Sequence, residues 1–197
     1  MPDPHAAGNY GRRDGLRNKT IMEPIRAVDV KVFATKGDAI DPYEFMGVLQ
    51  RWIRDHTIPG ILIDVADYSH IPQGNGIVLV GHEANVNVDY AGGRMGVLYR
   101  YKWPAEPDTA GRIEAAVKSA LDAAQKLENE PEFKGRLEFD KTAVEIISND
   151  RLRAPNTDEA AAGFSAAVEK AVSRVLSGAK VVRVSGDARE RLAVTAG

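Results

Sequence analysis

Between residues 61 and 102 the sequence shows four consecutive strand patterns with no helical pattern among them. Residues 61–66 and 77–80 are nearly continuous apolar runs, which are typical of strands covered on both faces. Residues 86–90 and 97–101 alternate apolar and polar side chains on either side of Gly92-Gly93, which predicts an antiparallel hairpin. A run of four strands differs from the strict strand–helix alternation of a doubly wound sheet.

Three segments carry the spacing of amphipathic helices. The clearest begins at Asp41-Pro42-Tyr43-Glu44, which combines a capping box with proline at the first helical position. A second helix is predicted over residues 109–127, and a third opens at Asn156 and ends near Gly178. The other predicted strands cover residues 28–32, 135–139, 143–148, 181–184 and 192–194.

These patterns predict an α+β fold with three helices packed on one face of a mixed, mostly antiparallel sheet. The chain has 197 residues, which suits one main domain with an extension. We expect a polar N-terminal extension over residues 1–26 and one α+β domain over residues 27–197. The extension has five basic and three acidic residues, a net charge of +2, which leaves −4 on the remainder.

The extension lacks apolar periodicity, so it cannot bury enough apolar surface to offset the entropy of ordering it. An ordinary terminal extension explains its first ten residues, and the surface of its own domain is one place where the segment could be held. The prediction that we carry forward is that it binds a protein partner or another copy of the chain. The basic residues expected to bind that partner are Arg12, Arg13, Arg17 and Lys19.

Composition excludes several classes of function. With no cysteine, the chain has no disulfide, thiolate metal site or cysteine nucleophile. The formal net charge of −2 argues against general nucleic-acid binding. No apolar run reaches the ~18 residues of a membrane span, and the N-terminus lacks a secretory pattern, so a cytoplasmic protein is expected. No dinucleotide or phosphate-loop motif is present, and no cofactor is predicted.

Side chains capable of chemistry are densest between residues 64 and 100. Asp64 interrupts an apolar strand and needs a partner there, because an unpaired buried carboxylate is costly. The candidate acid–base residues are Asp67, His70, His82 and Glu83, and the candidate metal ligands are Asp64, His70, His82 and Glu83. Their spacing matches no local ligand pattern. An ion-pair network of Asp64 and Asp67 with Arg94 and Arg100 explains the same residues without chemistry.

The second strand of the predicted hairpin carries an aromatic stretch. Tyr99, Tyr101 and Trp103 share one face of that strand, with Arg100 and Lys102 on the other. Such an aromatic face is ordinarily core beneath a helix. If the helices cover the opposite face, the three aromatic residues instead become a surface that binds a partner.

Two functions from different classes are compatible with these observations. The first is a non-catalytic accessory or assembly subunit that binds a protein partner, or self-associates, through its N-terminal arm and a sheet face. The alternative is a small metal-dependent or acid–base enzyme, or a ligand-binding domain, using Asp67, His70, His82 and Glu83.

Overall fold

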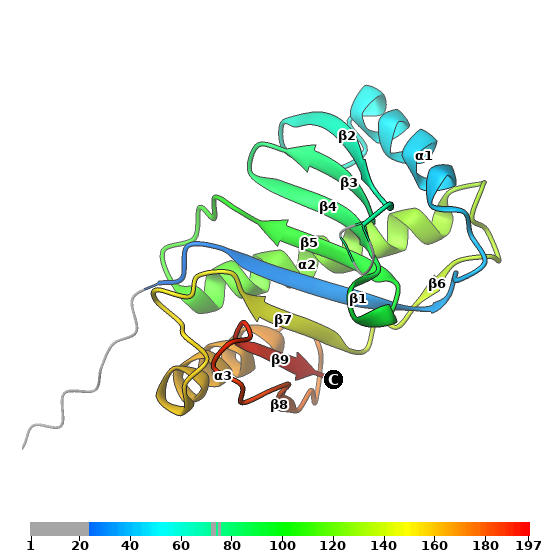
Figure 1. The fold of residues 1–197 in the computed structure, drawn as a ribbon. Helices are drawn as coiled ribbons and strands as arrows, with labels where there is room; N and C mark the ends of the chain where they lie inside the picture. The colour runs from blue at the N-terminus through cyan, green and yellow to red at the C-terminus, as the bar shows by residue number, and fades with distance from the viewer. Residues whose placement is uncertain (1–23, 72–73, 75) are drawn as a thin grey trace, which may run out of the picture.

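A computed structural model describes residues 24–71, 74 and 76–197, and within them the fold is α+β with three α-helices and a nine-stranded sheet (Figure 1). The elements in chain order are β1 (Val28–Lys36), α1 (Pro42–Asp55), β2 (Leu62–Tyr68), β3 (Gly76–Gly81), β4 (Ala84–Asp89), β5 (Gly96–Tyr101), α2 (Thr109–Asn129), β6 (Glu138–Phe139), β7 (Val144–Ser148), α3 (Asp158–Val172), β8 (Val181–Arg183) and β9 (Ala193–Ala196).

The sheet runs in the order β2-β3-β4-β5-β1-β7-β9-β8, with the short β6 paired to the end of β1. Each ladder between described strands is antiparallel. The first strand of the chain therefore lies in the middle, where it pairs with β5 on one side and β7 on the other. The predicted meander of four strands forms one half of the sheet.

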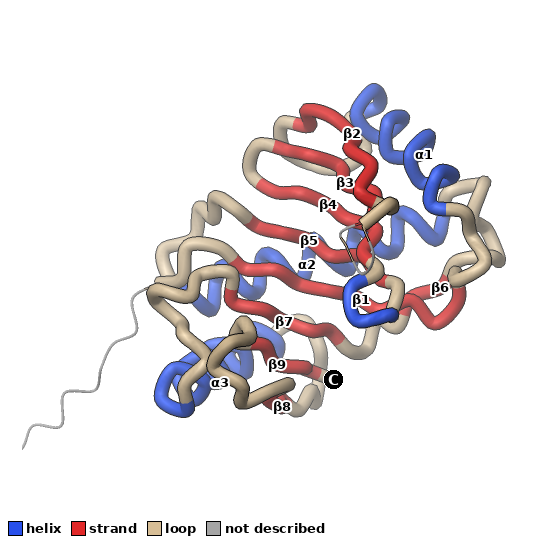
Figure 2. Tube along the Cα trace, viewed as in Figure 1, coloured by secondary structure: helices blue, strands red, loops and turns tan. Residues whose placement is uncertain are grey.

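The three helices pack on one face of the sheet, as predicted (Figure 2). Helix α1 contacts β2 and β3, α2 contacts β1 and β5, and α3 contacts α2, β8 and β9. On β1 the buried side chains Val28, Val30 and Val32 face these helices. Because side chains alternate along a strand, the residues between them lie on the other face of the sheet, which we call the helix-free face.

The predicted helix starts are largely confirmed. The Asp41 side chain accepts the Tyr43 N–H at 2.9 Å, and Glu44 completes the capping box of α1. Asp108 caps α2 by accepting the Gly111 N–H. The third helix starts two residues later than predicted, because Thr157 is its cap and the Asn156 amide donates to the Ser185 and Asp187 carbonyls instead. It also ends at Val172, before Gly178.

The glycine turn of the hairpin is confirmed as well. Gly92 and Gly93, with φ of 72° and 69°, lie in the left-handed region that favours glycine, between β4 and β5. In the ladder that they connect, Val88 pairs with Val97 and Asn85 with Arg100.

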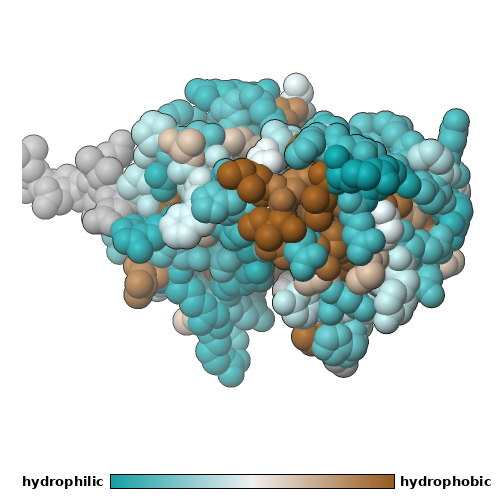
Figure 3. Space-filling model, turned by 90° about the horizontal axis from the view of Figure 1, so that it is seen from above, coloured by the Kyte–Doolittle hydropathy of each residue, from teal (hydrophilic) through white to brown (hydrophobic). Residues whose placement is uncertain are grey.

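The prediction that residues 61–66 form a strand covered on both faces is wrong. Strand β2 is an edge of the sheet, and Ile61 and Ile63 are 63% and 59% exposed. Apolar surface gathers on the side of the molecule where β2 and α1 lie (Figure 3). A bulge between Leu62 and Asp64 interrupts the pairing of β2 with β3, and bulges and charges are devices that protect a sheet edge from further pairing.

The chain is anchored from Ile25 onward. The Ile25 side chain is fully buried, and its N–H donates to the Thr109 hydroxyl at the start of α2. The Arg26 N–H donates to the Asp150 carboxylate at 2.9 Å. Both residues therefore take part in the packing of the fold, although the sequence places them at the end of the extension.

Candidate functional site

The helix-free face is lined by polar side chains from the middle of the sheet. Register fixes which residues share it, since directly opposed residues in an antiparallel ladder point to the same side. Its central residues are Asn85, Asn87 and Asp89 from β4, Leu98 and Arg100 from β5, Asp29, Lys31 and Phe33 from β1, and Glu145 and Ile147 from β7. Several of these charged groups are buried although none of the helices in the described residues covers them.

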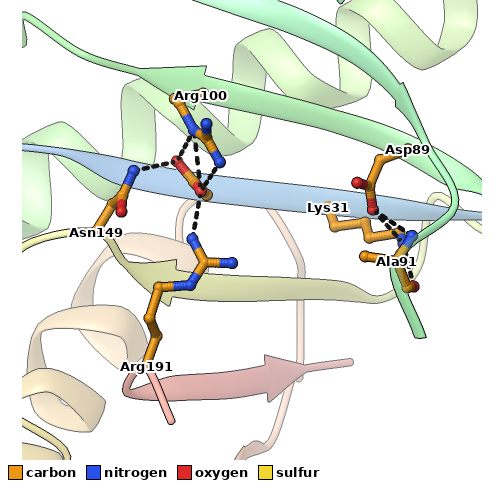
Figure 4. A network of polar contacts seen from close by, with 7 residues as sticks. Lys31, Asp89, Ala91, Arg100, Asn149 and Arg191 are labelled. Carbon is orange, nitrogen blue, oxygen red and sulfur yellow. Dashed lines mark hydrogen bonds and ion pairs between the residues drawn. The ribbon is translucent and has the colours of Figure 1, made fainter. Parts of the chain in front are cut away.

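Asp29 lies at the centre of the first polar cluster (Figure 4). Its carboxylate is fully buried and accepts hydrogen bonds from two nitrogens of Arg100: Nε lies 3.0 Å from Oδ1 and 3.2 Å from Oδ2, and Nη2 lies 2.9 Å from Oδ2. Arg191, which precedes β9, donates from Nη1 to Oδ2 at 2.9 Å, and Asn149 donates from Nδ2 to Oδ1 at 3.4 Å. The hydrogen bonds to Asp29 raise the pKa of the Arg100 guanidinium, so one carboxylate holds two permanent cations.

Lys31 and Asp89 form a second cluster, which is more deeply buried. Lys31 Nζ lies 2.6 Å from Asp89 Oδ2, and the two side chains are 4% and 1% exposed. The same ammonium donates to the carbonyls of Ala91 and Arg94, at 3.1 and 2.7 Å, which ties it to the turn between β4 and β5 (Figure 4). Glycine at position 96 leaves room for the extended Lys31 side chain, because a Cβ at this position would lie 2.9 Å from the Lys31 Cε.

Further polar atoms on this face have no hydrogen-bond partner in the part of the chain that the structure describes. Neither side-chain amide atom of Asn87 has a hydrogen bond within the described residues, although Asn87 is only 1% exposed. Oδ1 of Asp89 is likewise without a partner there. The Arg94 guanidinium lies over the Phe33 ring, 3.7 Å from the ring centroid, and so keeps its charge at the rim. The face therefore combines fixed charges with unused hydrogen-bonding capacity.

Glu145 makes the face sensitive to pH. Burial raises the pKa of its carboxyl, against the opposing effect of the Lys31, Arg94 and Arg191 cations and with a smaller contribution from Asp89. The folded protein therefore keeps this proton above about pH 4.3, where an unfolded glutamate releases it. Stability from this group is present below that pH and is lost as pH rises through the raised folded pKa.

We expect Glu145→Gln to remove the loss of folding stability that the wild-type protein shows as the pH rises. Urea unfolding at a series of pH values should give equal free energies for wild type and variant near pH 4, and a more stable variant near pH 7. A constant difference between the two proteins over that range would contradict the raised pKa. Glu138→Gln, an exposed change on the neighbouring strand β6, is the control.

The structure does not bring the four predicted acid–base residues together. Asp67 pairs with Ile77 at the start of β3, and His70 follows in the loop after β2. His82 and Glu83 follow Gly81 at the opposite end of β3, where Gly81 pairs with Leu62. Within the described residues, no group of three or more His, Asp or Glu side chains is arranged to hold a metal ion.

The carboxylates among these candidates have local structural partners. Asp67 accepts the Ser69 N–H at 2.8 Å, and its hydrogen bonds with Ser69 lower the pKa of its carboxyl. Glu83 accepts the Ile61 N–H at 3.1 Å, which lowers its pKa in the same way. Both side chains therefore stabilise chain reversals beside β2 and β3.

The predicted ion pairs between Asp64 or Asp67 and the hairpin arginines are also absent from the described contacts. Asp64 is exposed on the edge strand, so it needs no buried cation, and it accepts the N–H of the next residue, Val65, at 2.8 Å. Arg100 instead binds Asp29, a residue that sequence reasoning missed. The missed signal lies in Val28-Asp29-Val30-Lys31-Val32, where valine alternates with charged residues. The two charged positions are an acid, Asp29, and a base, Lys31.

The aromatic residues of β5 divide between two environments. Tyr99 and Tyr101 pack against the core on the helix side, with their ring centroids 6.0 Å apart. Trp103 lies beyond the end of the strand and is 68% exposed. Arg12, Arg13, Arg17 and Lys19, the predicted partner-binding residues of the extension, lie outside the described residues.

No family model, curated protein or solved structure matches the chain. The helices in the described part of the chain are all too short or too polar to cross a membrane.

Proposed function

We propose that this protein is a non-catalytic accessory or assembly subunit. It binds a protein partner, or another copy of itself, through the arm of residues 1–26 and the helix-free face of its sheet. The observation that carries this proposal is the helix-free face itself, on which the buried Asp29 holds two partly exposed arginine side chains, Arg100 and Arg191, in fixed positions.

Preorganisation supports a binding role for this face. Asp29 holds Arg100 and Arg191 from below, yet the two arginine side chains remain 25% and 38% exposed. Fixing a long cationic side chain before association reduces the entropy that association costs. Fixed charges of this kind contribute specificity and association rate more than they contribute bulk affinity.

Charge indicates the chemistry of the partner surface. The cations Lys31, Arg94, Arg100 and Arg191 stand against the acids Asp29, Asp89 and Glu145, which leaves a charge of +1 on the face, and +2 when Glu145 is protonated. The arm carries +2. Both surfaces therefore favour an acidic partner surface, and they disfavour docking of the arm on the helix-free face of another copy.

Three cavities lined by described residues offer little support for the enzyme alternative. Two crevices beside Ile58, beneath the sheet, hold about 20 and 30 Å³, which is room for one or two water molecules. A wider depression of about 490 Å³ is an open groove between residues 35–40 and Gly135-Arg136. None of these is lined by two of the predicted acid–base residues.

The experiment removes the arm without disturbing the anchored chain. Deletion of residues 1–23 keeps Ile25 and the Arg26 N–H in place. We expect the truncated chain to lose association by at least about tenfold while it melts like the full chain. Association is measured by sedimentation for self-assembly, and by quantitative capture from extracts of the source cells for a partner.

A second variant separates charge from length. Replacing Arg12, Arg13, Arg17 and Lys19 with glutamine in the full chain should weaken association as the truncation does, and the effect should shrink at high salt. Arg54→Gln, at an exposed pair with Asp55 on α1, is the control. Association that is equal in the full chain and both arm variants would refute the role of the arm.

A further inference from the structure

We propose that Arg100 and Arg191, positioned by Asp29, form a binding site for one oxyanion group, either a carboxylate or a phosphoryl group. This inference rests on the proposed function in taking the helix-free face as the working surface, and it names the chemistry that this face recognises. Its test uses small anions and needs no partner.

The cluster around Asp29 has more N–H donors than its carboxylate uses. The Asp29 carboxylate accepts hydrogen bonds from Nε and Nη2 of Arg100, from Nη1 of Arg191 and from the side-chain amide of Asn149. These bonds use the accessible lone pairs of its two oxygens. Nη1 of Arg100 and both Nε and Nη2 of Arg191 have no acceptor among the described residues. Both arginine side chains, which are 25% and 38% exposed, therefore keep charged N–H groups that no described residue accepts.

The cluster also carries an excess of positive charge. Two guanidinium groups on one carboxylate leave a net charge of +1 at the cluster, and guanidinium cannot lose its proton near neutral pH. Glu145 interacts electrostatically with Arg191, but burial raises the pKa of its carboxyl group, so it compensates the excess poorly. An external anion would complete the neutralisation that Asp29 begins.

The placement of the two arginines also favours an anion site. Arg100 comes from β5 and Arg191 from the chain just before β9, so the two side chains approach Asp29 from opposite sides of β1 (Figure 4). The carboxylate lies fully buried beneath them, whereas both guanidinium groups remain partly exposed. Arg191 keeps its Nε/Nη2 edge free of acceptors among the described residues, and such an edge matches the paired oxygens of a carboxylate or phosphate.

The competing explanation is a purely structural clamp that joins β5, β1 and β9. A clamp and an anion site differ in their response to added anions, because a clamp leaves its outward N–H groups to water. The two also respond differently to the removal of one arginine. Loss of a clamp lowers stability alone, whereas loss of an anion site also abolishes saturable binding.

The test is a titration of the ¹⁵N-labelled full chain, followed through the arginine Nε–H signals by NMR. Inorganic phosphate and glutarate are added in separate experiments at constant ionic strength, with chloride as the background anion. We expect saturable shifts of the Arg191 and Arg100 signals. Saturation by glutarate alone identifies a carboxylate site, by phosphate alone a phosphoryl site, and by both a general oxyanion site. Saturation by neither overturns the proposal.

The decisive variant is Arg191→Met, with Arg189→Met as its matched control. Arg189 lies two residues away, is 90% exposed and pairs with Asp187, so its loss changes net charge equally without touching Asp29. We expect Arg191→Met to weaken anion binding at least about tenfold, and Arg189→Met less than about twofold. Equal weakening by the two variants would show a diffuse charge effect and refute the site.

Folding of the variant is secured separately. Arg191→Met leaves Asp29 bonded to Arg100 and Asn149, so the buried carboxylate keeps a cation. Arg191→Lys provides a second measurement, because lysine retains the charge but loses the fork. We expect it to bind anions more weakly than wild type and more tightly than Arg191→Met. Anion affinity unchanged in both variants would contradict the proposal, whereas the association experiment on the arm would be unaffected.

Discussion

Replacing Lys31 with methionine is expected to lower the free energy of unfolding by about 3–5 kcal/mol. The change leaves Asp89 with no cation at a position where its side chain is 1% exposed. It also removes the donor to the carbonyls of Ala91 and Arg94, so the turn between β4 and β5 loses these two hydrogen bonds to β1. Urea unfolding, followed by far-ultraviolet circular dichroism, gives the difference directly.

Two further variants distinguish the buried pair from charge in general. Lys36→Met removes an exposed lysine at the end of the same strand, whose partner Glu138 is also exposed, and should cost less than about 0.5 kcal/mol. Combining Lys31→Met with Asp89→Leu removes both charges and should recover most of the lost stability. A single Lys31→Met variant that unfolds within about 1 kcal/mol of wild type would contradict this account.

Replacing Trp52 with alanine is expected to cost about 3–5 kcal/mol, the usual range for deleting a buried tryptophan. Trp52 is fully buried on the inner face of α1, and its indole N–H donates to Glu130 at the end of α2. The variant therefore leaves a cavity under α1 and breaks the link between the two helices. Calorimetry should show the loss as a fall in Tm of about 2–4 °C per kcal/mol for a chain of this length.

Trp52→Phe separates packing from hydrogen bonding at the same position. Phenylalanine keeps much of the apolar volume but cannot donate to Glu130, so its cost should be clearly smaller than that of alanine. Amide hydrogen exchange should report increased opening of β2 in the alanine variant, because α1 covers that strand. Equal melting of the alanine and phenylalanine variants would show that the apolar contact contributes little.

The elements of this fold could be predicted where their signals are local. The capping residues of α1 lie within four positions of one another, and the glycines of the β4–β5 turn directly join two alternating strands. The predicted environment of a strand was wrong where it depends on which strands, distant in the sequence, lie beside it. The apolar run at residues 61–66 has the pattern of a covered strand, yet it lies at an edge of the sheet. Its position could not be predicted, because nothing in that run encodes the order of the strands.

The candidate site was only partly predictable, for the same reason. The sequence places Arg100 in a possible ion-pair network with Asp64 and Asp67, which are nearby in the chain. Its partner in the structure, Asp29, lies 71 positions away from it, and Arg191 is 162 positions from Asp29. Lys31 reaches Asp89 across β5, which requires knowing that β1 pairs with β5 at this register. The imidazole and carboxylate candidates are close in sequence, but β3 separates them, because it runs its full length between the two groups.

The central position of β1 has a consequence for synthesis of the chain. Its neighbours in the sheet begin at residues 96 and 144, so a nascent chain that has emerged only to residue 95 contains a central strand with neither neighbour. The hairpins of β2, β3 and β4 need only local contacts, which form fastest. We therefore expect the meander to fold on the nascent chain before β1 pairs with it. The strands β7, β9 and β8 should join the sheet last.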